Sequence, residues 1–296
     1  MAVRLYENFR GVLYAPFYAA QAIGAYAVQG VTVELVSSPD PLASHAALRS
    51  GAADVMWGGP LRVLIGYDRE PDCDLVCFGE AVARDPFFLI GTKAWPGFQL
   101  TDLSRLRLAT VSEVPTPWIC LADDIRRVGL DPATLTRVAD RSMAENAEAL
   151  RRGEVDVIQV FEPVAETLIR AGIGQVWHAA ADRGLTAYTC FVTRKPRLAQ
   201  RRGELQSMAR SLRQTLEWVH ASSGAEIALA VAPYFPDVPR LHLAGAAERY
   251  KRLGIWGRDA VLRPEGFDRL KAAMLAHGTI RRGAEHAVCV DNSLST

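Results

Sequence analysis

The stretch LRSGAADV at residues 48–55 returns in altered form as LRRGEVDV at residues 150–157, and both follow the pattern Leu-Arg-x-Gly-x-x-Asp-Val. In each copy the Gly is a typical helix end, and an apolar run typical of a buried strand follows the Asp. A helix–strand junction that occurs twice indicates an internal duplication. The two copies therefore predict that the chain consists of two similar halves.

The segments around the two copies follow the same order. The first half has a strand, an Ala-rich helix and a β-branched strand before the repeat, at 3–9, 16–30 and 31–38. The second half has a strand, a helix, a strand and a helix opened by a Ser142-x-x-Glu145 capping box, at 105–113, 117–130, 135–140 and 142–153. Each half is thus predicted as a β-α-β-α-β unit. Asp54 and Asp156, which recur in both halves, are expected to bond local backbone groups.

The rest of the chain predicts how the two units are joined. Extended segments at 73–92 and 185–194 are expected to cross between the units, and the C-terminal third has only helical patterns. We therefore expect an α/β fold of two lobes with hinge crossings. Lobe 1 would comprise residues 1–88 and 192–296, and lobe 2 residues 89–191. Such lobes are expected to close around a small molecule at the carboxyl ends of their strands.

The composition excludes several classes of protein. The chain has 296 residues and a formal net charge of +1, so it carries no electrostatic signature of nucleic-acid binding. It contains no run of 18 apolar residues, and no membrane span is predicted. The N-terminus MAVRLYENF has no signal-peptide pattern, which predicts a cytoplasmic protein, or a periplasmic one if a signal has been removed. Five cysteines at irregular spacings do not indicate a disulfide framework.

The candidates for ligand binding follow strands, open helices or lie on the crossings. They are Asn8, Phe9, Arg10, Tyr14, Trp57, Gly58, Gly59, Arg62, Asp85, Glu113, Thr116, Trp118, Glu162 and Tyr188. The motif Trp57-Gly58-Gly59-Pro60 is the most informative, because an aromatic face beside two glycines lets a flat ligand approach the backbone. The alternative for this motif is a tight strand-to-helix turn with a core tryptophan.

Other candidates also have a structural alternative that the sequence leaves open. Thr116 binds the ligand or caps its own helix, and Trp118 lines the cleft or packs in the core. Glu113 and Glu162 are expected to accept hydrogen bonds from an amine or hydroxyl of the ligand, rather than to act as an acid–base pair.

The sequence lacks the motifs that carry common chemistries. It has no G-x-S-x-G, no H-E-x-x-H, no P-loop and no G-x-G-x-x-G. The six histidines are dispersed, and none has Cys or His at metal-ligand spacing. Neither a cofactor nor a metal is expected.

The stretch YAPFYAAQAIGAYAVQGVTVELVSS (14–38), followed by LRSGAADVMWGGPLRVL (48–64), resembles the NMT1/THI5-like family of solute-binding proteins, related to the sulfonate and taurine binders. The resemblance includes VSEVPTPW (111–118) and VDNSL (290–294). It implies a type II periplasmic-binding-protein fold, a planar or anionic ligand between the lobes, and an ABC permease as partner for exported members. The pyrimidine synthases of this family carry a C-C-C-F-C motif. The nearest stretch here, CDLVCF (73–78), is not that motif, so their activity is not expected.

Two functions from different classes follow. The first is a solute-binding protein that holds a thiamine-pyrimidine-like molecule, an aromatic carboxylate or a sulfonate, with Tyr14, Trp57 and Trp118 stacking on it. Arg10 or Arg62 would meet its negative charge, and the backbone at Gly58 and Gly59 would donate hydrogen bonds. The second is a cytoplasmic enzyme on the same fold, either a decarboxylase or a thiamine-pyrimidine pathway protein. A third is a ligand sensor that forms a complex with another chain.

Overall fold

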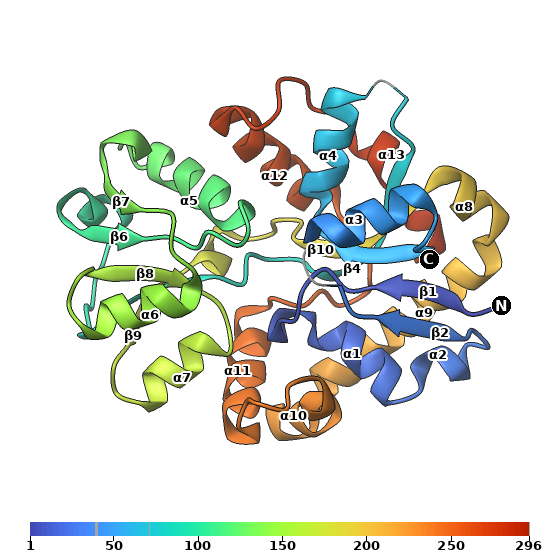
Figure 1. The fold of residues 1–296 in the computed structure, drawn as a ribbon, viewed down its shortest axis with the longest axis horizontal. Helices are drawn as coiled ribbons and strands as arrows, with labels where there is room; N and C mark the ends of the chain where they lie inside the picture. The colour runs from blue at the N-terminus through green and yellow to red at the C-terminus, as the bar shows by residue number, and fades with distance from the viewer. Residues whose placement is uncertain (39–40, 71, 296) are drawn as a thin grey trace.

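The computed structural model describes residues 1–38, 41–70 and 72–295, which form two lobes, each built on a five-stranded sheet (Figure 1). The first sheet has the order β2-β1-β3-β10-β4 and contains β1 (Val3–Tyr6), β2 (Val33–Val36), β3 (Val55–Gly58), β4 (Leu75–Val82) and β10 (Thr189–Arg194). The second has the order β7-β6-β8-β5-β9 and contains β5 (Phe88–Gly91), β6 (Arg107–Ala109), β7 (Thr136–Val138), β8 (Val157–Val160) and β9 (Gln175–Ala179).

The two sheets have the same plan. In the first, β1 is parallel to β2 and β3, and β10 inserts antiparallel between β3 and β4. In the second, β6 is parallel to β7 and β8, and β5 inserts antiparallel between β8 and β9. Each inserted strand directly follows a crossing: β5 follows the crossing from the first sheet, and β10 follows the crossing from the second. Each sheet is therefore completed by the first strand that the chain forms after it crosses from the other lobe. The predicted duplication is confirmed.

The helices also follow the duplicated order. The first half contains α1 (Ala15–Ala22), α2 (Ala25–Val28), α3 (Pro41–Ser50) and α4 (Pro60–Arg69), and the second α5 (Thr116–Arg127), α6 (Met143–Arg151) and α7 (Val164–Arg170). The C-terminal part contains α8 (Lys195–Gln200), α9 (Arg202–Ala221), α10 (Gly224–Val231), α11 (Arg240–Leu253), α12 (Pro264–His277) and α13 (His286–Cys289). The helix predicted at 16–30 is broken at Gly24, whose φ of 72° lies in the left-handed region.

The two repeated aspartates hold equivalent positions. The Asp54 carboxylate accepts a hydrogen bond from the backbone N–H of Arg4 (2.8 Å), at the start of β1. The Asp156 carboxylate does the same with Arg107 (2.7 Å), at the start of β6. Each aspartate therefore ties the third strand of its unit to the first. The expectation of local backbone partners was wrong, because the bonded N–H lies about 50 residues earlier on the neighbouring parallel strand.

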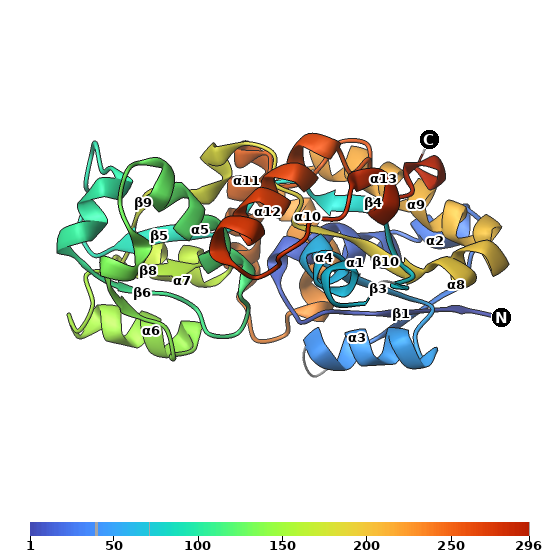
Figure 2. The same ribbon diagram turned by 90° about the horizontal axis from the view of Figure 1, so that it is seen from above.

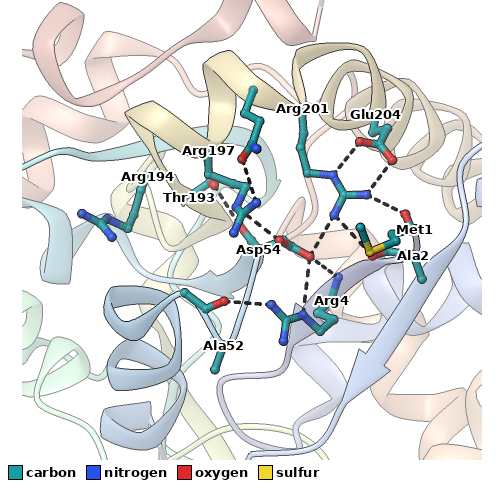
Figure 3. A network of polar contacts seen from close by, with 12 residues as sticks. Met1, Ala2, Arg4, Ala52, Asp54, Thr193, Arg194, Arg197, Arg201 and Glu204 are labelled. Atoms are coloured by element: carbon teal, nitrogen blue, oxygen red, sulfur yellow. Dashed lines mark hydrogen bonds and ion pairs between the residues drawn. The ribbon is translucent and has the colours of Figure 1, made fainter.

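Asp54 has further partners that Asp156 lacks, all from the C-terminal return of the chain (Figure 3). Its carboxylate lies 3.2 Å from the Arg197 Nε and 3.0 Å from an Arg201 Nη, and its side chain is 4% exposed. The Asp156 side chain is 34% exposed and pairs with Arg107. The first lobe thus joins β1, β3 and helices α8 and α9 through one buried carboxylate.

Two helices of the C-terminal return connect the lobes. Both lie between the lobes in the two views (Figure 1 and Figure 2). Helix α12 packs on α4 of the first lobe and on α5 of the second, and α11 packs on α10 and reaches α7. Arg249 of α11 forms ion pairs with Glu162 and Glu166 of the second lobe.

The two crossings define the boundaries between the lobes, which differ by a few residues from the division expected from the sequence. The chain leaves the first sheet after Val82 and enters the second at Phe88, then returns between Ala179 and Thr189. Phe88, which the sequence division places in lobe 1, therefore starts a strand of the second sheet. Residues 189–191, placed in lobe 2, lie in β10 of the first sheet. None of the described helices is long and apolar enough to cross a membrane.

Candidate functional site

The carboxyl ends of the parallel strands of the two lobes meet through aromatic rings. Phe9, just beyond β1, lies 5.9 Å from Phe161, just beyond β8 (ring centroids). Phe87, on the first crossing, lies 5.1 Å from Phe161 and 6.3 Å from Tyr188 on the second crossing. Phe9 also meets Tyr14 edge-on at 5.1 Å. These rings bring both lobes and both crossings to one place, as expected for ligand sites in α/β sheets.

Polar atoms without protein partners lie among these rings. The Asn8 Nδ2 donates to the Tyr14 hydroxyl at 3.2 Å, while the Asn8 Oδ1 and the Tyr188 hydroxyl are buried and find no partner among the described residues. Burial raises the pKa of Tyr188 well above its usual value, and the nearby Asp85 adds to that rise. Because buried polar atoms are almost always satisfied, these two atoms mark a place where a partner is missing.

We call Asn8, Phe9, Tyr14, Gly59, Phe87, Phe161 and Tyr188 the interlobe site. Burial raises the pKa of Tyr14, against the effects of the hydrogen bond from Asn8 and the positive charge of Arg62. Gly59 lies at the rim, where an added Cβ would meet the backbone oxygen of Tyr188 at 3.1 Å. The glycine thus allows the turn after β3 to approach the second crossing closely.

Helices that begin at these strand ends lack side-chain caps. In the described residues, no side chain caps the first N–H groups of α1, α4 or α5, and each of these helices has proline in its first turn. In contrast, α6 opens with the predicted Ser142–Glu145 capping box, and α10 has a Ser223–Glu226 box. The first N–H groups of a helix are donors that favour an anion when no side chain satisfies them.

The predicted Trp57 and Gly58 lie next to the interlobe site: the Trp57 ring is 5.8 Å from that of Tyr14 (centroids), and a Cβ at Gly58 would stand 4.0 Å from the Asn8 Oδ1. Trp57 is fully buried, and its ring stacks on Phe17 at 4.9 Å within the core, which matches the alternative of a core tryptophan. Gly58 is the last residue of β3 and pairs with Cys190. Arg10 is exposed, and its guanidinium donates to the Glu7 carboxylate (2.8 and 3.0 Å) and to the Tyr234 carbonyl (2.7 Å). Its charge is therefore already paired.

The predicted residues of the second lobe divide into three locations. The Glu113 carboxylate accepts the backbone N–H of Met143 at 2.8 Å, at the start of α6. Thr116 is the first residue of α5, after Pro115, so it does not serve as the N-cap. Trp118 lies on the same helix with the guanidinium of Arg137 stacked over its ring at 3.8 Å.

Two predicted acidic residues are engaged in ion pairs. Glu162 is fully buried and pairs with Arg249, and burial raises the pKa of its carboxyl despite that arginine. Asp85 accepts the backbone N–H of Phe87 (3.1 Å) and an Nη of Arg183 (3.0 Å) on the other crossing. Burial likewise raises the pKa of Asp85, with Arg183 opposing the rise. Both carboxylates therefore hold the lobes and crossings together.

Sequence reasoning missed Phe87. Phe161 stands next to the predicted Glu162, directly after β8, at the position that corresponds to Gly59 in the first half, so its strand-end position identifies it. Phe87 lies on a crossing that has no sequence signature of contact with a ligand. The cysteines offer no activated thiol: all five are free, and burial raises the pKa of Cys120 to about 12. Among the described residues, no three His, Cys, Asp or Glu side chains gather as a metal site.

Comparisons with known proteins agree with this architecture. The model of the NMT1/THI5 like family matches residues 13–224. The YtlA protein of Bacillus subtilis (strain 168), described as a binding protein, is 20% identical over 296 residues, covering 99% of this chain and 88% of its own length.

Two solved structures show the same fold. The periplasmic aliphatic sulphonate-binding protein SsuA from Escherichia coli has a TM-score of 0.79 at 14% identity, over 98% of this chain and 92% of that chain. The alkanesulfonate-binding protein SsuA from Xanthomonas axonopodis pv. citri, bound to MOPS, has a TM-score of 0.73 at 17% identity, over 98% of both chains. The chain belongs to the NMT1/THI5-like family and has the periplasmic-binding-protein fold.

Proposed function

We propose that this protein is a solute-binding protein of ABC import type, which holds a small anionic ligand with a planar or apolar part at the interlobe site. The observation that carries the proposal is the pair of buried, unpartnered polar atoms, the Asn8 Oδ1 and the Tyr188 hydroxyl, between the lobes. A ligand with a hydroxyl or amine would satisfy both.

The surroundings favour an anion with an apolar part. The charged side chains beside the site are compensated, because Asp85 pairs with Arg183 and Glu162 with Arg249. Uncapped N–H groups at the starts of α4 and α5 then provide the favourable potential for negative charge. The rings of Phe9, Phe87 and Phe161 provide contact for an aromatic or aliphatic body.

The relatives support a sulfonate as the first ligand to test. Two structures with this fold are described as sulfonate-binding proteins, one of them with the sulfonate buffer MOPS bound. By the same reasoning we place the protein outside the cytoplasmic membrane, where an ABC permease would receive its ligand. The enzyme alternative has no support from the site, in which no side chain is placed as an activated nucleophile.

Thermal unfolding with a ligand panel tests the proposal. The panel contains taurine, longer alkanesulfonates, aromatic carboxylates and thiamine pyrimidines. A ligand at 100 times its Kd stabilises the folded state by about 2.7 kcal/mol, which raises Tm by roughly 5–10 °C. Mass spectrometry of the recovered ligand should show it chemically unchanged. Turnover of a panel compound would contradict the proposal and favour an enzyme.

A further inference from the structure

A surface groove lies between α5, the segment before and within β7, and the C-terminal end of α12. Its volume is about 370 Å³, and its lining includes Trp118, Arg126, Arg137 and His277. Trp118 and Arg126 are eight residues apart on one face of α5, so the groove follows about 12 Å of that helix. His277 is the last residue of α12. Helices α5 and α12 lie side by side (Figure 1), so the groove combines residues of the second lobe with a residue of the C-terminal return.

The groove holds cationic groups and no acidic side chain. No carboxylate is among its lining residues. Arg137 stacks on Trp118 at 3.8 Å and donates to the Thr110 hydroxyl at 3.1 Å, and burial lowers its pKa with no carboxylate to oppose the effect. Within the described parts of the chain, neither Arg126 nor Arg137 forms an ion pair.

Other arginines on or beside α5 do form ion pairs, in contrast to Arg126 and Arg137. Arg127, next to Arg126 on α5, pairs with Asp123 at 2.7 Å. Arg183 pairs with Asp124 of the same helix. The carboxylates of α5 thus satisfy arginines outside the groove, and the two groove arginines keep their charge uncompensated.

His277 adds a third group that can become cationic. Its Nδ1 shares a hydrogen bond with the Thr279 hydroxyl at 3.0 Å. Partial burial lowers the pKa of His277, and the facing charges of Arg126 on α5 and Arg137 on β7 lower it further. An anion between these groups would reverse the last two effects and raise the pKa of His277.

We propose that this groove binds a small tetrahedral oxyanion, of the phosphate or sulfate type, between Arg126, Arg137 and His277. Planar guanidinium groups bind such oxyanions through paired N–H donors. The site is separate from the interlobe site, since the two share none of their lining residues. Because the residues that would bind the anion come from α5 and β7 of the second lobe and from α12 of the C-terminal return, a bound anion favours the arrangement of these elements seen here.

The imidazole signals of His277 in an NMR titration of the full chain provide the test. Inorganic phosphate and sulfate are added separately at constant ionic strength, with chloride as the balancing anion. We expect a saturable shift and a rise in the pKa of His277 by at least half a unit at saturation. A linear response equal to that of chloride would overturn the proposal, because it would reflect screening alone.

Matched variants locate the binding. Arg126→Met removes an exposed groove charge, whereas Arg127→Met removes the neighbouring charge that is paired with Asp123 outside the groove. We expect Arg126→Met to weaken phosphate binding at least fivefold and Arg127→Met to change it less than twofold. Equal effects of the two variants would overturn the site. Arg137→Lys, which keeps the charge but loses the planar stack on Trp118, should give an intermediate affinity.

Discussion

Arg249 of α11 forms an ion pair with the fully buried Glu162 of the second lobe, and so joins the C-terminal return to the end of β8. The same guanidinium contacts Glu166 at 2.6 Å. Replacement of one partner of a buried pair leaves the other charge uncompensated, which commonly costs about 3–5 kcal/mol. Arg249→Met is therefore expected to lower the free energy of unfolding by that amount, measured by urea denaturation at pH 8.

The stability of Arg249→Met should depend on pH. Burial already raises the pKa of Glu162 in the native protein, and loss of the arginine raises it further. A carboxyl whose pKa is raised in the folded state binds its proton more tightly there than in the unfolded state. The free energy of unfolding therefore falls as the pH rises above 4.5, the pKa of the carboxyl in the unfolded chain. The variant should thus recover much of its stability at pH 5. Addition of Glu162→Gln should abolish this recovery, and a pH-independent loss would contradict the explanation.

Asp54 and Asp156 provide a matched pair of substitutions. Each accepts the backbone N–H of an arginine in the first two residues of a strand, but Asp54 is buried and also contacts Arg197 and Arg201. We expect Asp54→Asn to lower the free energy of unfolding by about 2–4 kcal/mol and Asp156→Asn by at most about 1 kcal/mol. Urea denaturation of both variants measures the difference. Equal losses would show that the contacts with α8 and α9 contribute nothing.

Tyr188→Phe should affect stability and binding in opposite directions. The hydroxyl is buried without a partner among the described residues, so its removal is expected to stabilise the ligand-free protein by about 1 kcal/mol. The affinity for a ligand that bonds this hydroxyl should fall about tenfold. Calorimetric titration with the ligand from the thermal screen measures the second effect.

The control for that substitution is Tyr67→Phe. The Tyr67 hydroxyl donates to the Leu75 carbonyl at 3.2 Å, away from the interlobe site. This variant should retain full affinity. If Tyr188→Phe also retains it, the unpartnered hydroxyl is not a ligand contact.

Gly59→Ala tests the close approach of the turn after β3 to the second crossing. Its φ of −78° suits alanine, so the effect comes from the 3.1 Å contact of the new Cβ with the Tyr188 oxygen. A loss of about 1–2 kcal/mol in stability and a weaker affinity for the ligand are expected. Gly203→Ala, in α9 with no atom within 4 Å of the new Cβ, should be neutral or stabilising. Thermal unfolding of both variants with and without ligand compares them.

The sequence predicted what local patterns encode. The order of strands and helices in both halves, and the Ser142–Glu145 capping box, followed from periodicity and from cap residues. Helix α7 and strand β9 were not predicted, because both elements are short and the sequence at 164–179 has no clear hydrophobic period. The insertion of β10 into the first sheet and of β5 into the second could not be predicted from local sequence patterns either, since it depends on pairing between strands that are distant in the sequence.

The site was harder to predict than the fold. Trp57 and Phe9 both stand near a strand end, yet Trp57 is buried against Phe17 while Phe9 meets the other lobe. Which of two strand-end rings faces the core depends on packing within the whole lobe. Arg10 illustrates the same difficulty, because its partner Glu7 and the Tyr234 carbonyl lie on different parts of the chain.

The exchanged strand β10 sets an order for folding during synthesis. The second sheet is built from the continuous segment 88–179, so all of its strands emerge from the ribosome together. The first sheet must leave the place between β3 and β4 empty until residues 189–194 emerge. At roughly 5–20 residues per second, about 100 residues take on the order of 5–20 s. During that time the edges of β3 and β4 lack their partner strand and are open to pairing with other chains.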